Sequence, residues 1–127
     1  MPILHFGRAT DPPIHEAVHI NTDAILFVEK CHNMQVGKTA IHVMGLDAEP
    51  IRVTESLTEV LVHLPGFVQA RRHYLAAEPA NGADAVHIAA QNVSYVLPNV
   101  PQAPLFWTVH FTDASELCIV EPLPARL

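Results

Sequence analysis

Segments rich in Val, Ile and Phe recur along the chain and are separated by Pro, Gly, Asn and Asp. Such segments are typical of β-strands, and the residues between them are typical of turns. In the first half of the chain this pattern predicts five short strands, at residues 3–7, 17–20, 24–31, 39–44 and 50–54.

A helix is predicted directly after the fifth strand. Ser56-Leu57-Thr58-Glu59 has the form of a capping box, and Leu57, Val60, Leu61 and Leu64 are spaced as the apolar stripe of a short amphipathic helix. Pro65-Gly66 ends it. Many strands with one helix predict an α+β fold that is mainly β.

The second half of the chain repeats the pattern of the first. Ala17-Val18-His19-Ile20 recurs as Ala85-Val86-His87-Ile88. At the same spacing, residues 25–28 match 93–96, and residues 41–43 match 109–111. After a small length change in a turn, residues 51–57 match 117–123. Residues 3–8 match 67–72 more weakly. We therefore predict two tandem copies of a five-stranded unit, at residues 2–64 and 66–127, within one compact domain. The helix is expected only after the first copy, because the second ends at Pro122-Leu123-Pro124.

The unit resembles a known family in its strand and turn motifs. The matching residues are Arg8, Ile20-Asn21-Thr22-Asp23-Ala24-Ile25, Thr39-Ala40-Ile41-His42-Val43 and Val53-Thr54-Glu55-Ser56-Leu57. In this pattern the unit resembles the small flagellar FlbD family, which implies a small regulatory or interaction protein and no catalytic residues. The second copy departs from the pattern, with Ile88-Ala89 in place of the Asn and Gln91 at the Asp position.

A looser likeness links the repeated β units to LytTR-type DNA-binding domains, but the charge balance argues against nucleic-acid binding. The formal net charge is −6, and the seven basic residues are scattered apart from Arg71-Arg72. A surface that neutralises phosphates needs clustered cations.

Several other classes of protein are disfavoured by composition. The longest apolar runs are far shorter than the roughly 20 residues of a membrane span, and no signal-peptide pattern opens the chain, so we expect a cytoplasmic protein. Cys31 and Cys118 are expected to be buried free thiols, with a single disulfide as the alternative.

His15-Glu16-Ala17-Val18-His19 matches the zinc-protease motif HExxH. That chemistry needs both imidazoles on one face of a helix, whereas residues 17–20 are predicted to be a strand. Residues i and i+4 of a strand lie about 13 Å apart, too far for one zinc ion. We therefore expect no zincin site.

Four histidines occupy equivalent places in the two copies: His19 and His42 in the first, His87 and His110 in the second. If their strands are neighbours, each pair could bind a transition metal or respond to pH. The alternative is a half-exposed face on which these side chains bond to backbone or water.

The sequence offers little for nucleophilic catalysis. Cys31 and His32 are adjacent, so on a strand they point to opposite faces and form no dyad. The five glycines are dispersed and form no phosphate-binding loop. We expect no enzyme activity and no cofactor.

The leading functional hypothesis is a non-catalytic interaction or regulatory module that binds itself or a partner protein through an edge strand or an apolar patch. The alternative is a small-ligand or metal-binding protein that uses the paired histidines. An uncovered sheet in the second copy predicts a homo-oligomer, most simply a dimer, with Trp107, Leu123 and Leu127 as candidate contact residues.

Overall fold

The computed structural model describes residues 3–10, 16–31, 36–45, 49–73, 85–99, 106–120 and 123–127. His15 of the zincin-like motif and the 101–105 stretch before Trp107 lie outside these ranges. No helix in the described parts of the chain has the length and apolar character needed to cross a membrane.

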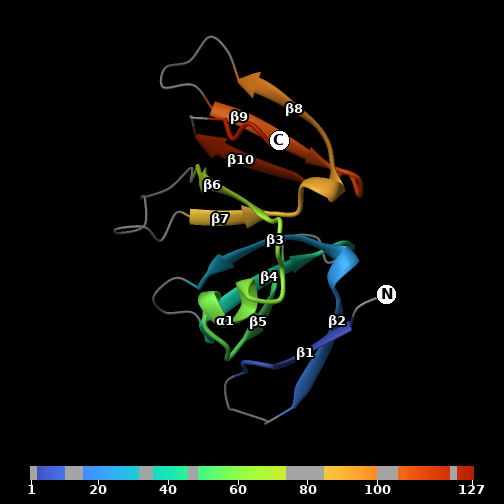
Figure 1. The fold of residues 1–127 in the computed structure, drawn as a ribbon, viewed down its shortest axis with the longest axis vertical. Helices are drawn as coiled ribbons and strands as arrows, with labels where there is room; N and C mark the ends of the chain where they lie inside the picture. Colours follow the sequence, from blue (N-terminus) through green and yellow to red (C-terminus); the bar gives the residue numbers. More distant parts are fainter. Residues whose placement is uncertain are drawn as a thin grey trace.

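The fold is mainly β, as the sequence predicts, with one short α-helix (Figure 1). Each of the five strands expected in the first half is present, with its ends within one residue of the prediction. The strands are β1 Ile3–Gly7, β2 Ala17–Asn21, β3 Ile25–Lys30, β4 Thr39–Val43, β5 Ile51–Val53, β6 Val68–Arg72, β7 Ala85–Ile88, β8 Val93–Asn99, β9 Phe106–Phe111 and β10 Glu116–Val120. The helix α1 is Leu57–Leu61, and two 3₁₀ helices are Thr22–Ala24 and Ala90–Asn92.

Eight strands form one antiparallel sheet in the order β5-β4-β3-β7-β6-β10-β9-β8. β1 and β2 form a separate antiparallel pair. A bridge between Arg8 and Val53 connects this pair to β5, and the Thr54 N–H donates to the Gly7 carbonyl at 2.8 Å. Within the described residues, β2 pairs only with β1 and β8 only with β9, whereas the other two end strands, β1 and β5, are linked to each other through this bridge.

The strand pairings of the first half recur in the second. β3 pairs with β4 as β8 pairs with β9, and both ladders have a register shift at the same place. β1 pairs with β2 as β6 pairs with β7. Four residue pairs of the first half have an equivalent pair in the second half. Ile25–Val43 corresponds to Val93–Phe111, Phe27–His42 to Tyr95–His110, His5–His19 to Gln69–His87, and Arg8–Val53 to Arg72–Ile119.

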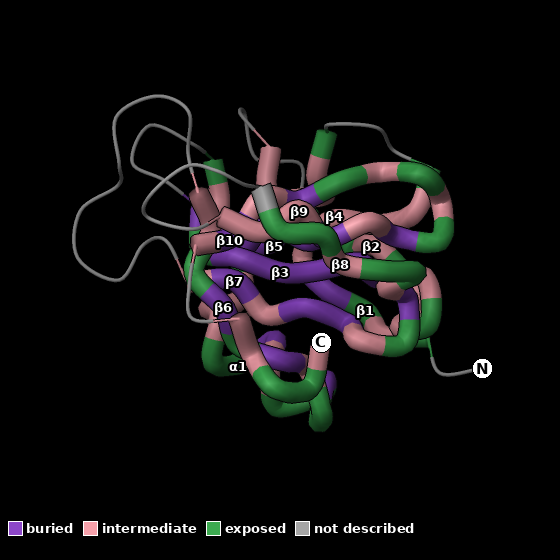
Figure 2. Tube along the Cα trace, turned by 90° about the horizontal axis from the view of Figure 1, so that it is seen from above, coloured by how far each residue is buried: buried purple, intermediate pink, exposed green. Residues whose placement is uncertain are grey.

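β3 is the strand that joins the two halves, because it pairs with β4 on one side and β7 on the other. Five of its six residues are buried, and Figure 2 shows it as a continuous buried strand. Ile25 and Val28 belong to the core of the first half, whereas Leu26 and Phe27 belong to the core of the second. The two halves therefore share a strand and form one packed unit.

The helix begins where the sequence predicts and ends earlier. Ser56 caps it, and the Ser56 and Glu59 side chains form both bonds of the capping box. α1 ends at Leu61, and the chain turns before Gly66, whose φ of +88° favours glycine. Val60 and Leu64 are buried in the first core.

The C-terminal tail covers part of the second core, contrary to the expectation of an uncovered sheet there. Leu123 and Leu127 pack against that core, and the Leu127 N–H donates to the Pro124 carbonyl at 3.1 Å. Leu123 stands at the place that Leu57 occupies in the first half, where Leu57 packs against the first core. Leu123 and Leu127 thus cover part of the second core, as the helix covers part of the first.

Candidate functional site

A buried ion cluster lies where β3 meets the second half. The Glu29 side chain on β3 is only 5% exposed, and its Oε2 accepts hydrogen bonds from His42 Nε2 at 2.7 Å and from Arg72 Nη1. His42 comes from β4 and Arg72 from β6, so the cluster draws on three strands of both halves. A buried carboxylate needs such partners because its desolvation is costly.

Phe27 packs against both side chains that bond to Glu29. The His42 ring stacks on the Phe27 ring with centroids 4.0 Å apart, and the Arg72 guanidinium lies 5.6 Å from the centroid of the same ring. The cluster connects the two halves, and its charged groups are engaged with one another.

The predicted histidine pairs do not lie on neighbouring strands. β2, with His19, pairs with β1, whereas β4, with His42, lies between β3 and β5. Likewise β7, with His87, lies between β3 and β6, whereas β9, with His110, lies between β8 and β10. The topology therefore separates the strands that the metal hypothesis needs side by side.

Each of these histidines has a different environment. His19 makes an edge-to-face contact with His5 across the β1–β2 pair, with ring centroids 4.1 Å apart. His110 stacks on Tyr95, as His42 stacks on Phe27, and its Nδ1 lies 3.4 Å from Glu116 Oε1. Within the residues that the structure describes, no group of three or more His, Cys, Asp or Glu side chains could hold a metal ion.

The pKa of His87 is lowered by burial, and this gives a pH prediction. Because the unfolded chain takes up the proton first, the part of the stability that comes from neutral His87 is present above pH of about 6.5 and is lost as the pH falls below it. We expect His87→Gln to make the loss of stability on acidification below about pH 6.5 shallower. Urea denaturation at several pH values measures this, and identical slopes in the two proteins would contradict it.

The residues expected to make external contacts are partly buried instead. Trp107 on β9 packs against the second core together with Leu123 and Leu127. All three are half-buried. Trp107 lies on β9, between β8 and β10, and its side chain packs on the second core.

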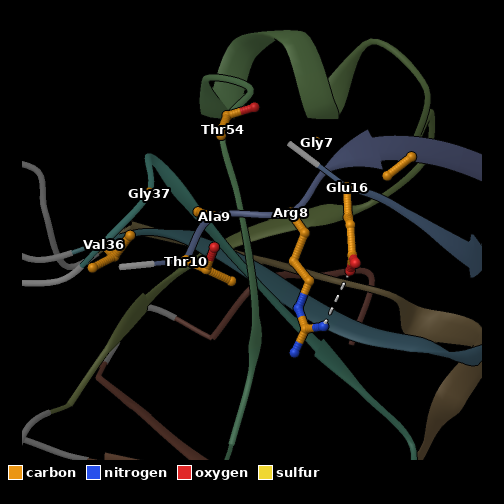
Figure 3. A pocket seen from close by; sticks show the side chains of 9 residues that line it. Gly7, Arg8, Ala9, Thr10, Glu16, Val36, Gly37 and Thr54 are labelled. Carbon is orange, nitrogen blue, oxygen red and sulfur yellow. Dashed lines mark ion pairs between the residues drawn. The ribbon is translucent and has the colours of Figure 1, made fainter. Parts of the chain in front are cut away.

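A pocket of about 490 Å³ opens beside the end of β1 (Figure 3). Arg8 and Glu16 line it, and their charged atoms lie 4.0 Å apart with both side chains more than half exposed. Such an exposed pair contributes little to binding energy. Two residues of the zincin-like motif lie in this region. Glu16 faces Arg8, and His19 lies on strand β2, as the sequence predicts.

Cys31 is not an activated nucleophile. Both cysteines are free, as expected; Cys31 is buried and Cys118 is half-buried. Burial raises the pKa of the Cys31 thiol; Arg52 acts in the opposite direction, and Glu29 adds to the rise. A thiol with a raised pKa is a poor nucleophile at neutral pH.

The strand β8, at one end of the sheet, carries exposed large apolar side chains. Tyr95 is 53% exposed and Leu97 51% exposed, whereas the residues that align with them in the first half, Phe27 and Glu29, are 5% and 4% exposed. These counterparts are buried because β7 covers β3. Sequence reasoning missed this site, because the alignment of the two halves does not indicate which of the two equivalent strands has a neighbour on both sides.

Comparison with protein-family models, with curated proteins and with solved structures finds no match for this chain.

Proposed function

We propose that this chain is a non-catalytic protein-interaction module that binds copies of itself through the outer edge of β8. The module would consist of two copies of one five-stranded unit, and the matched registers of the two halves support that duplication. A cytoplasmic setting agrees with the free thiols of Cys31 and Cys118.

One observation carries the proposal: the β8 edge presents two large apolar side chains beside backbone groups that have no strand partner among the described residues. An exposed apolar edge is a template for another strand, and proteins that stay monomeric block such edges with charge or cover them. Along β8, residues 93–99 contain no charged residue. A sheet that continues across two chains would bury Tyr95 and Leu97.

Light scattering on purified protein at micromolar concentration tests the proposal. The wild-type chain is expected to have a mass that is a multiple of 13.9 kDa. Replacing Tyr95→Lys together with Leu97→Lys should return the mass to that of one chain. The loss of a central apolar contact of about 2–3 kcal/mol raises the dissociation constant by about 30- to 150-fold.

The control is Val62→Lys, because Val62 is 72% exposed and lies at the end of α1, away from β8. This variant carries one added charge and should keep the wild-type mass. A wild-type protein with the mass of a single chain over the whole concentration range would refute the proposed self-association.

A further inference from the structure

We infer that β8 of one protomer pairs with β2 of the next, in the register that already joins β3 to β7 within the chain. This inference rests on the proposed function and names its partner surface. In the internal junction Phe27 pairs with Ile88, Val28 with His87 and Glu29 with Val86. In the alignment of the two halves, β8 corresponds to β3 and β2 corresponds to β7. The equivalent pairs are Tyr95, Val96 and Leu97 with the partner's Ile20, the partner's His19 and the partner's Val18.

Within the described residues, the outer sides of β8 and β2 are unpaired. Their counterparts β3 and β7 pair with each other on the equivalent sides. β8 is the last strand of the sheet, and β2 pairs only with β1. Figure 1 places β8 at one end of the long axis and the β1–β2 pair at the other. One chain therefore carries both strands of a second junction, but at opposite ends of the molecule. The two strands can pair only when they belong to different chains.

The backbone groups of the two edges point in the direction that this pairing requires. The Arg8 N–H donates to the Glu16 carbonyl at 2.8 Å, so Glu16 faces β1. Because successive residues of a strand alternate in direction, the N–H and C=O of His19 face away from β1.

The same reasoning applies to β8 through its counterpart. The Cys31 N–H donates to the Lys38 carbonyl at 3.0 Å on the β4 side, so by alternation Val28 faces β7. Val96, the counterpart of Val28, then faces away from β9. Val96 and the partner's His19 are paired in the proposed register, and both offer a free donor and a free acceptor to one another.

The side chains at the proposed junction also fit. Leu97 would lie opposite the partner's Val18, an apolar pair in place of Glu29 and Val86. Arg8, which stands where Arg72 stands in the second half, already has Glu16 as its partner, so the missing carboxylate leaves no charge unpaired. By the same alternation Lys30, the next residue of β3, also faces β7, and its counterpart on β8 is Pro98, which has no N–H. The proposed pairing therefore ends at Leu97 with one hydrogen bond fewer than the internal junction.

Such a contact is heterologous, because it uses two different edges. Each added chain presents a new free edge, and the assembly ends only when the rotation between protomers closes a ring. This separates the inference from a twofold contact of β8 with β8, in which each chain would use the same edge.

Two variants that each block one edge test the pairing. Val96→Pro removes the outward N–H of β8, and His19→Pro removes that of β2. Each variant alone should have the mass of one chain, about 13.9 kDa, by light scattering. An equimolar mixture should form a heterodimer of twice that mass, because each variant retains the edge that the other needs. Val96→Ala and His19→Ala keep the N–H and should retain the wild-type mass, and circular dichroism checks that all four variants are folded.

The outcomes separate the inference from the proposed function. If the wild-type protein is monomeric, both fail. If the wild-type assembles but His19→Pro alone still dimerises, or the mixture forms no heterodimer, self-association stands and the β8–β2 pairing is wrong.

Disulfide trapping gives a second reading that does not depend on proline. In a Cys31→Ala, Cys118→Ala background, Leu97→Cys and Val18→Cys would form a directly opposed pair without ladder hydrogen bonds. Cβ atoms in such a pair lie at the short end of the cross-strand range, near about 4.5 Å, which is within reach of a disulfide. Mild oxidation of the two variants mixed should give the 97–18 heterodimer as the main product on a non-reducing gel. A predominant Leu97→Cys homodimer would overturn the inference in favour of β8 pairing with itself.

Discussion

Phe27→Ala is expected to destabilise the chain by about 3–5 kcal/mol, the usual cost of removing a large buried aromatic side chain. Phe27 is 5% exposed and belongs to the second core although it lies on β3 of the first half. It stacks on His42 at 4.0 Å and lies near Phe111, with ring centroids 5.9 Å apart. Urea denaturation measures the loss, and a single transition is expected because β3 belongs to both cores.

Tyr95→Ala is the matched control, because Tyr95 has the equivalent place in the second half and is 53% exposed. In a Leu97→Lys background, where assembly makes no contribution, it should cost less than about 1 kcal/mol. Equal losses for the two substitutions would mean that β7 does not cover Phe27 in the way the structure shows.

Arg72→Met is expected to destabilise the chain by about 3 kcal/mol, because it removes a charged hydrogen-bond partner from the buried Glu29 carboxylate. Removing the carboxylate as well should recover most of this loss. The double variant Glu29→Leu, Arg72→Met places at position 29 the residue that position 97 already carries. A double-mutant cycle by urea denaturation measures the coupling.

Glu29→Leu alone serves as the comparison. Arg72 is 29% exposed in its side chain and can reach water when the carboxylate is gone, so a smaller loss of about 1 kcal/mol is expected. Additive losses in the double variant would show that Glu29 and Arg72 do not interact in solution.

The junction between the halves and the exposed edges have one physical origin in the proposed duplication. A duplicated chain that pairs the third strand of its first unit with the second strand of its second unit leaves one unused copy of each strand at the ends. The internal junction buries Val28 fully and Glu29 almost fully. The same burial at the outer edges requires a second protein molecule.

The strands of the first half, the mainly β class and the capped helix could all be read from the sequence alone. These features depend on short-range signals, namely apolar side chains in strands, Pro and Gly at turns, and the bonds between Ser56 and Glu59. The resemblance between the halves was also visible, because it lies in the order of the residues. The strand character of residues 17–20 was enough to argue against a helical zinc site at His19.

Only the tertiary structure decided which strands are neighbours. Glu29 and Arg72 are 43 residues apart, and nothing near either residue indicates that β3 pairs with β7. The same applies to the histidines, whose equivalent places in the two halves suggested pairs that the strand order keeps apart. Strand pairing depends on the burial that the whole sheet achieves, and a local pattern of residues is compatible with several orders of strands. The partial burial of Trp107 on β9, between β8 and β10, and the exposure of Tyr95 on the last strand follow from that order.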